Sequence, residues 1–402
     1  MRILLAPGAL WPEPGGTPLA GSKSGLHASA VANALAEGWR TVRPTDELTV
    51  MPLGDGAPGT AATLPGWLVA ERVQLRAADP LGRQREVDLL RLTAPAPDDL
   101  SVLTDPSSGG ETRTWYLDAA ALTLLPEDRT EAGRQAREGS TRGLGLLLAA
   151  ALECVGEGGT LIVGLTRTAV HDGGAGLLDA LGGLAAARDR LRPYAVVLAL
   201  ADELALGGLS GAGAGLPQIT DLDEGEAQSV DQRACAVAGA LMRAAKREDS
   251  RLLPVLGQGP VTLSMTSWGT GAAGGVALAL RLAGATAAPG ARVFGWLSGV
   301  VPAARSQDLC VTAAGSLYTL AGAATCVLVG EQALKQAVPC ALVAGRCRAP
   351  RAELAEAGIG STYELEALAD GGGQQPWEEL GTTELVRRLR VLGERLARSW
   401  SR

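Results

Sequence analysis

Lysine is scarce in this chain, and no cluster of basic residues is interleaved with aromatic ones. The only lysines are Lys23, Lys246 and Lys335, and the formal net charge at pH 7 is −7. Nucleic-acid binding needs a concentrated positive surface that meets the backbone phosphates. We therefore expect no nucleic-acid partner.

Paired cysteine motifs are also missing. The six cysteines contain no C-x-x-C pair, and four of them lie in apolar runs: Cys154, Cys235, Cys310, Cys326, Cys340 and Cys347. This spacing is typical of reduced core residues and not of a disulfide framework or a zinc site. A cytoplasmic location is the expectation that follows.

No apolar run is long enough to cross a bilayer. The longest, around residues 144–152, is far shorter than the roughly 20 residues that a spanning helix needs. The N-terminal run MRILLAP breaks at Pro7, short of the apolar region of a signal peptide. We expect no membrane partner.

Hydrophobic patterning along the 402 residues indicates two α/β lobes. Residues 2–7 and 48–51 read as strands flanking an amphipathic helix over 26–39, an order that favours a parallel sheet. Successive strands over 73–79, 85–93 and 114–121 indicate a different, mixed arrangement. Strand–helix alternation returns after Gly284, which predicts that the second lobe is inserted into the first.

The stretch from Leu161 to Gly182 combines an apolar strand, a glycine-rich turn and a short helix. Backbone N–H groups at such a turn point outward beside the positive end of the helix dipole, where an anion can dock. A plain turn with a helix cap is the alternative reading of the same residues.

Two motifs carry a family resemblance. Residues 172–176, DGGAG, followed by Leu178 and Ala180-Leu181-Gly182, resemble the GGSATNDGGAG and LxALG patterns of the bacterial glycerate kinase family. Residues 269–284, GTGAAGGVALALRLAG, resemble the family's GAGAAGGLGAGLLAFLG. The resemblance implies ATP-dependent, magnesium-dependent phosphorylation of D-glycerate or a similar small hydroxy acid to phosphoglycerate.

The resemblance also implies the architecture. We expect an α/β protein in which a Rossmann-like parallel-sheet domain is built from both chain ends, residues 1–64 and 286–402. Residues 65–285 are expected to form an inserted α/β domain with a mixed sheet. The protein is expected to be a monomer or a homodimer.

Two candidate residues come from the first part of the chain. Asp55 survives in GDGAPGT, which resembles the family's Ala-Asp-Gly-Gly-Glu-Gly-Thr, and its place at a strand end suits a carboxylate for Mg²⁺. Pro58 replaces the family's glutamate. Lys23 aligns with the lysine of the first motif and precedes a helix, so it is either a phosphate-binding residue or a solvated loop lysine.

Two further catalytic candidates are adjacent in the central motif. Asp172 is retained, whereas His171 replaces the family's asparagine. A neutral imidazole can still hydrogen-bond a substrate, and it can act as a base near neutral pH. Alternatively, His171 only caps a helix.

The last family motif, GEGRxD followed by QTLxGK, has lost its charges. Its glutamate, aspartate and lysine fall on Ala314, near Tyr318 and on Ala323. The glycine-rich turns are nevertheless expected to cradle the phosphates of ATP, and the glycines assigned to cofactor binding are Gly173, Gly174, Gly271, Gly274 and Gly315.

Two functions from different classes remain open. The first is a divergent kinase that binds a nucleotide and a glycerate-like acid, with Arg167 or Arg346 as replacements for the missing positive charge. The second is a catalytically weakened or inactive homologue that acts by binding or assembly. A nicotinamide-dependent enzyme is not expected, because no GxGxxG follows the first strand.

Overall fold

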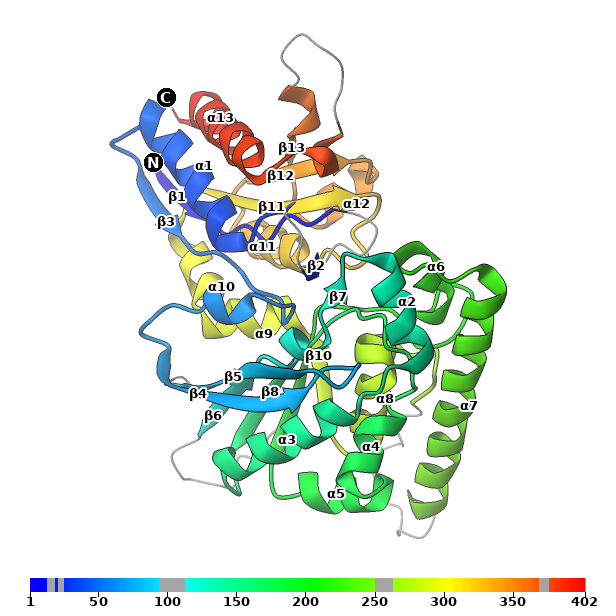
Figure 1. Cartoon of the computed structure of the whole chain (residues 1–402). Helices are drawn as coiled ribbons and strands as arrows, with labels where there is room; N and C mark the ends of the chain where they lie inside the picture. The colour runs from blue at the N-terminus through cyan, green and yellow to red at the C-terminus, as the bar shows by residue number, and fades with distance from the viewer. Residues whose placement is uncertain (13–18, 21–24, 94–112, 250–262, 369–375, 402) are drawn as a thin grey trace. The chain divides into compact units, whose positions relative to one another are not determined.

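The computed structural model describes residues 1–12, 19–20, 25–93, 113–249, 263–368 and 376–401. Contacts within the chain divide it into two compact units. Unit 1 contains Met1–Asp55, Gly59–Leu68 and Pro289–Arg402, and unit 2 contains Gly56–Pro58 and Val69–Ala288. Each unit has its own main sheet (Figure 1). The predicted α/β class, with one parallel and one mixed sheet, is confirmed.

Unit 1 is built on a five-stranded sheet of parallel strands in the order β13-β12-β11-β1-β3. The strands are β1 (Arg2–Leu5), β3 (Glu47–Val50), β11 (Leu309–Leu317), β12 (Cys340–Cys347) and β13 (Ser361–Glu364). The chain leaves β1 in one direction across the sheet and later continues from β11 in the other. Ligands of such sheets bind beyond the carboxyl ends of the strands at this reversal.

Helices cover both faces of this sheet (Figure 1). The helices of unit 1 are α1 (Ala28–Val42), α9 (Gly290–Leu297), α10 (Val300–Ala303), α11 (Ala324–Lys335), α12 (Arg351–Glu356) and α13 (Thr382–Trp400). Alternate residues of β11 face opposite ways. Val311 and Ala313 lie in the core with α1 and α13, whereas the Thr312 hydroxyl donates to Cys326 Sγ of α11 at 3.8 Å.

Helices α1 and α13 pack closely because each carries a glycine at the crossing. A Cβ on Gly38 would overlap the carbonyl oxygen of Arg390, and a Cβ on Gly393 would overlap that of Leu35. Four leucines at helical spacing form a buried stripe on α13: Leu385, Leu389, Leu392 and Leu396. Helix α13 docks on unit 1 through this stripe.

Unit 2 is built on a mixed six-stranded sheet in the order β10-β9-β8-β6-β5-β4. The strands are β4 (Val69–Ala78), β5 (Gln84–Leu92), β6 (Thr114–Leu117), β8 (Thr160–Leu165), β9 (Ala195–Leu200) and β10 (Thr286–Pro289). Strands β4, β5 and β6 pair antiparallel, and β6, β8 and β9 pair parallel. The carboxyl ends of β6, β8 and β9 consequently share one edge.

The helices of unit 2 are α2 (Arg129–Glu138), α3 (Arg142–Val155), α4 (Ala175–Leu181), α5 (Leu184–Leu191), α6 (Leu216–Ile219), α7 (Glu224–Asp249) and α8 (Val276–Leu282). Leu161, Val163 and Leu165 alternate along β8 and share one core with residues of α3, α4, α5 and α8.

Short elements complete the chain. The two-residue strands are β2 (Leu19–Ala20) and β7 (Leu125–Pro126). The 3-10 helices are η1 (Thr60–Ala62), η3 (Ala119–Thr123), η4 (Gly213–Gly215), η5 (Ala272–Gly275), η6 (Ala304–Ser306), η7 (Glu366–Leu368) and η8 (Trp377–Glu379). In the described ranges, no helix has the length and apolarity that crossing a membrane requires.

The glycine crossing of α1 and α13 gives a first prediction. Gly38→Ala should lower the free energy of unfolding by about 1–3 kcal/mol, because the added methyl group forces the two backbones apart. Urea or thermal unfolding measures the change. Gly66→Ala is the matched control, since nothing lies within 4 Å of a Cβ at Gly66. Equal stability of the two variants would contradict the close crossing.

Candidate functional site

Two glycine-rich loops of unit 2 pack directly against each other. The N–H of Gly173 donates to the carbonyl oxygen of Gly274 at 2.9 Å. A Cβ on Gly174 would lie 2.9 Å from the carbonyl oxygen of Gly275, and one on Gly274 would overlap that of Val170. Gly173, Gly174 and Gly274 also have positive φ values of 68°, 78° and 67°. Glycine is needed here for backbone conformation and for close approach.

The second loop also docks on the carboxyl edge of the sheet. The N–H of Gly271 donates to the carbonyl oxygen of Leu204, just beyond β9, and the N–H of Ala273 donates to that of Thr166, just beyond β8, both at 2.9 Å. The structure therefore brings four of the five predicted glycines, including Gly271, together at the edge where ligands of parallel strands bind.

Asp172 acts as a shared cap for two helices. Its carboxylate accepts hydrogen bonds from the N–H and hydroxyl of Thr141, which precedes α3, at 2.8 and 2.9 Å. It also accepts from the N–H groups of Gly174 and Gly176 at the start of α4, at 2.9 and 3.2 Å. Asp172 therefore caps two helix starts, a structural role that the sequence motif did not reveal.

The start of α4 satisfies its own backbone donors. The N–H groups of residues 173–177 all donate within unit 2: to Gly274, to Asp172 three times and to the hydroxyl of Thr141. An anion at this turn would have to displace one of these acceptors. The predicted contact of Gly173 and Gly174 with a cofactor stays a prediction.

His171 is held by a carboxylate from α7. Its Nε2 lies 3.1 Å from Asp231 Oδ1, and its side chain is only 2% exposed. The thiol of Cys235 donates to the same Asp231 oxygen at 3.6 Å. Burial and the neighbouring Asp231 carboxylate raise the pKa of Cys235 to about 11, so this thiol is protonated at neutral pH. Asp231 fixes the imidazole, and a catalytic role for His171 stays a prediction.

Sequence reasoning missed Asp202, which follows β9 at the carboxyl edge. Its Oδ1 accepts the N–H of Leu204 at 3.0 Å, whereas Oδ2 is inaccessible to solvent and has no hydrogen-bond partner. The residue as a whole is partly exposed through its other atoms. Burial raises the pKa of this carboxyl, although Leu204 and Arg167 oppose the shift. A buried, unpaired carboxylate oxygen is costly and marks a place for a cation or a substrate donor.

A second missed carboxyl stands at the same edge, after β6. Asp118 is buried and accepts the Tyr116 hydroxyl at 3.2 Å. Burial raises the pKa of Asp118 to about 7, which suits proton transfer near neutral pH. The sequence ADELALGG around Asp202 and the strand end before Asp118 match no motif, so only the shared sheet edge singles them out.

The predicted residues of unit 1 divide into three cases. Asp55 is partly buried in the loop that follows β3. Lys23 lies outside the residues that the structure describes. Gly315 lies in β11, and a Cβ there would be 2.7 Å from the carbonyl oxygen of Trp11 and 3.2 Å from the Trp377 ring.

Trp377 fills the space above two neighbouring strands of unit 1. Its indole lies where a side chain on Gly345 of β12 would have to lie, and it also faces Gly315 of β11. The indole is fully buried, and its N–H donates to the Ser316 hydroxyl at 2.8 Å. The close approach that Gly315 permits is therefore made by the protein's own tryptophan.

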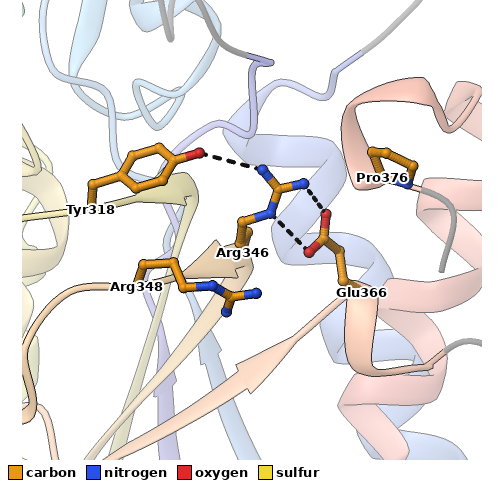
Figure 2. A pocket seen from close by; sticks show the side chains of 5 residues that line it. All are labelled: Tyr318, Arg346, Arg348, Glu366 and Pro376. Atoms are coloured by element: carbon orange, nitrogen blue, oxygen red, sulfur yellow. Dashed lines mark hydrogen bonds and ion pairs between the residues drawn. The ribbon is translucent and has the colours of Figure 1, made fainter.

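Beside this tryptophan, unit 1 has a pocket of about 430 Å³ lined by Tyr318, Arg346, Arg348, Glu366 and Pro376 (Figure 2). Arg346 donates to both carboxylate oxygens of Glu366 at 2.9 and 2.6 Å, and the Tyr318 hydroxyl lies 3.3 Å from the guanidinium. This hydrogen-bonded pairing holds the pKa of Glu366 below its usual range. The central charge of the pocket is thus internally compensated.

No preformed metal cage is found in the described part of the chain: no group of three or more histidine, cysteine, aspartate or glutamate side chains is placed to hold an ion. Magnesium does not require one, because it usually keeps several waters and binds one or two carboxylates plus substrate phosphates. The unpaired Oδ2 of Asp202 fits that requirement.

Comparison with known proteins decides the family. The sequence model described as the glycerate kinase family matches residues 21–372. The chain belongs to the glycerate kinase family. It is 29% identical to the glycerate 2-kinase of Escherichia coli over 184 residues, 45% of this chain and 39% of that protein.

Two further comparisons cover nearly the whole chain. An uncharacterized protein of Mycobacterium tuberculosis is 28% identical over 387 residues, 93% of this chain and 88% of that protein. A crystal structure assigned to glycerate kinase 2 of Salmonella typhimurium LT2 has a TM-score of 0.62 at 20% identity and covers 99% of this chain and 98% of that one. At that identity the likeness shows the fold.

Within the glycerate kinase fold, the shared cap gives a second prediction. Asp172→Ala should lower the free energy of unfolding by about 2–4 kcal/mol, because two helix starts lose their acceptor. Asp179→Ala is the control: Asp179 lies on α4, is exposed, and pairs with Arg142 on the surface, where a pair contributes about 0–1 kcal/mol. Unchanged melting of Asp172→Ala with lost turnover would instead give Asp172 a direct role in chemistry.

Proposed function

We propose that this glycerate kinase family member transfers the terminal phosphoryl group of ATP to a hydroxyl of D-glycerate or a similar small hydroxy acid, giving a phosphoglycerate. The observation that carries the proposal is the buried, unpaired Oδ2 of Asp202 at the carboxyl edge of β9. An unpaired buried carboxylate oxygen costs stability, and a bound cation or substrate donor would satisfy it.

The proposed reaction needs positioning and charge stabilisation more than covalent chemistry. The acceptor hydroxyl oxygen bonds to the γ-phosphorus as the bond from that phosphorus to the bridging oxygen of ADP breaks. The bonding electron pair stays on ADP, and the hydroxyl proton is released. Magnesium, when bound, neutralises charge on the phosphate oxygens.

The proposal assigns metal binding, proton transfer, phosphate binding and substrate contact to particular residues. Asp202 holds magnesium in unit 2, and Asp118, with its raised pKa, is a candidate to receive the hydroxyl proton. For unit 1 the proposal keeps the roles that the family resemblance implies, with Asp55 as a magnesium-binding carboxylate and Lys23 as a phosphate-binding residue. His171, held by Asp231, contacts the acceptor molecule.

A second candidate function is a family member that has kept the fold without the transfer reaction. Two observations in unit 1 favour it. Trp377 fills the space that glycines at the ends of β11 and β12 leave open, and Arg346 is paired with its own glutamate. Ala314 and Ala323 stand where the family resemblance expects charges. The buried, unpaired oxygen of Asp202 favours the kinase, because its burial lowers stability unless a ligand pairs with it.

Asp202 gives a third prediction. In the absence of metal, Asp202→Asn should be at least as stable as the wild type, and its advantage in melting temperature should grow as the pH rises. Burial raises the pKa of Asp202, so the folded protein loses stability as the pH rises through that pKa, and the amide removes this loss. The same variant should have no detectable ADP production from ATP and glycerate.

Thermal melting with Mg-ATP separates the two functions. A ligand at a hundredfold excess over its Kd stabilises the folded state by about 2.7 kcal/mol. Under the kinase proposal Mg-ATP raises the wild-type melting temperature, and Asp202→Asn, Asp55→Ala and Lys23→Ala each reduce the rise. No response to millimolar Mg-ATP, together with a flat glycerate-dependent ADP assay, would establish the fold-retaining alternative. Glu203→Gln is the control for a charge change next to Asp202.

A further inference from the structure

Phosphoryl transfer needs a positive charge that meets the phosphate oxygens, and this chain lacks the family's lysine at Ala323. Of its three lysines, Lys23 lies outside the described residues and keeps the phosphate-binding role proposed above. Lys246 lies on α7 and Lys335 ends α11, both outside the strand edges where ligands bind.

Three arginines at carboxyl edges of the described strands are the remaining candidates, and one of them, Arg348 just after β12, is paired with Glu364 at 3.3 Å. Arg346 lies in β12 of unit 1, and Arg167 lies two residues beyond the end of β8 in unit 2.

Arg346 is already committed to carboxylates of its own unit. Its guanidinium donates to both oxygens of Glu366 (Figure 2). Its Nη2 also lies 3.4 Å from Glu378 Oε2. Glu378 in turn accepts the Ser316 hydroxyl at 2.8 Å, which fixes it in place. A phosphate at Arg346 would have to compete with two negative charges. The guanidinium is therefore not free to bind a transferring phosphoryl group.

Arg167 has the opposite environment. Among the described residues, no hydrogen bond or ion pair is found for its guanidinium, although the side chain is partly buried. Its Nη2 lies 2.6 Å from where a Cβ on Gly215 would be, so the guanidinium packs against the backbone of this glycine. The residue stands where the family's GGSATN stretch has a second glycine, so the chain has gained a cation at this strand end.

The neighbourhood of Arg167 is suited to a phosphate. The guanidinium is close enough to Asp202 to lower the pKa of that carboxyl, yet no ion pair joins them in the described structure. Asp202 Oδ2 therefore remains available for a cation while Arg167 remains available for an anion. A magnesium–phosphate group has both charges, and the planar guanidinium fork matches two phosphate oxygens.

We propose that Arg167 binds the terminal phosphoryl group of the nucleotide at the carboxyl edge of β8 in unit 2. The inference rests on the proposed function for its reaction, and on the geometry of Arg167, Gly215 and Asp202 for its site. Arg167 stabilises the charge on the phosphate oxygens and gains or loses no proton. Gly215 lies beside the guanidinium, and a side chain there would make the end of Arg167 shift.

The fourth prediction uses binding and kinetics together. Arg167→Gln should weaken binding of sodium tripolyphosphate, measured by calorimetry at low ionic strength, by at least tenfold. It should lower kcat/KM for Mg-ATP by about a hundredfold or more, because arginines on transferring phosphates have effects of this order or larger. The KM for glycerate should change less than threefold. Arg167→Lys should restore part of the loss.

Matched variants separate the site from general charge effects. Arg233→Gln removes the same charge from an exposed position on α7, and it should leave tripolyphosphate binding unchanged. Arg346→Gln tests the rival arginine and should also leave it unchanged. Gly215→Ala keeps the charge of Arg167 and makes its guanidinium shift, so it should weaken tripolyphosphate binding less than Arg167→Gln does.

Each outcome decides one of the two proposals. Equal tripolyphosphate binding by Arg167→Gln and Arg233→Gln overturns the inference, and so does a rise in the KM for glycerate with unchanged use of Mg-ATP, which would place Arg167 on the substrate carboxylate. If wild-type protein binds tripolyphosphate through Arg167 but makes no ADP, the kinase proposal fails and the anion site stands.

Discussion

The carboxylate of Asp172 is the interaction on which the organisation of unit 2 depends. It joins the start of α3 to the start of α4 by accepting from Thr141, Gly174 and Gly176. Because these donors are fixed, Gly173 can donate to Gly274 and bring the second glycine-rich loop against the first. That loop then closes over the ends of β8 and β9. The site edge is rigid because its backbone donors are satisfied inside the protein.

This use of the glycine-rich turns changes what they can contribute to ligand binding. A turn whose N–H groups are unpaired attracts anions, but the N–H groups of residues 173–177 already have acceptors. The turns therefore act as a scaffold, and charge has to come from side chains beside them. Asp202 and Arg167 are the side chains in that position, and neither satisfies the other within hydrogen-bond distance.

The charged side chains at the strand ends differ between the two units in whether they are paired. In unit 1, Arg346 is compensated by Glu366 and Glu378, and Trp377 occupies the space above the strand ends. In unit 2, the Asp202 carboxyl keeps a buried oxygen without a partner. Compensated charges favour stability, whereas uncompensated charges favour binding. The chain has thus kept its unsatisfied charges where two loops hold the backbone rigid.

The sequence by itself determined the α/β class, the glycerate kinase resemblance and the leucine stripe of α13, because these depend on local periodicity and contiguous motifs. It also located the glycine-rich loops that the structure brings together. It did not reveal that Asp172 is a cap, since its partner Thr141 lies 31 residues earlier in the chain.

Only the tertiary structure decided which charges are free. The sequence alone does not distinguish Arg346 from Arg167. In the structure, Glu366 pairs with Arg346, whereas no described residue pairs with Arg167. Asp202 stands in a mostly apolar stretch that matches no motif, and its importance comes from the burial of its Oδ2 beyond the end of β9. Burial and pairing depend on residues that are distant in sequence, so local sequence patterns cannot reveal them.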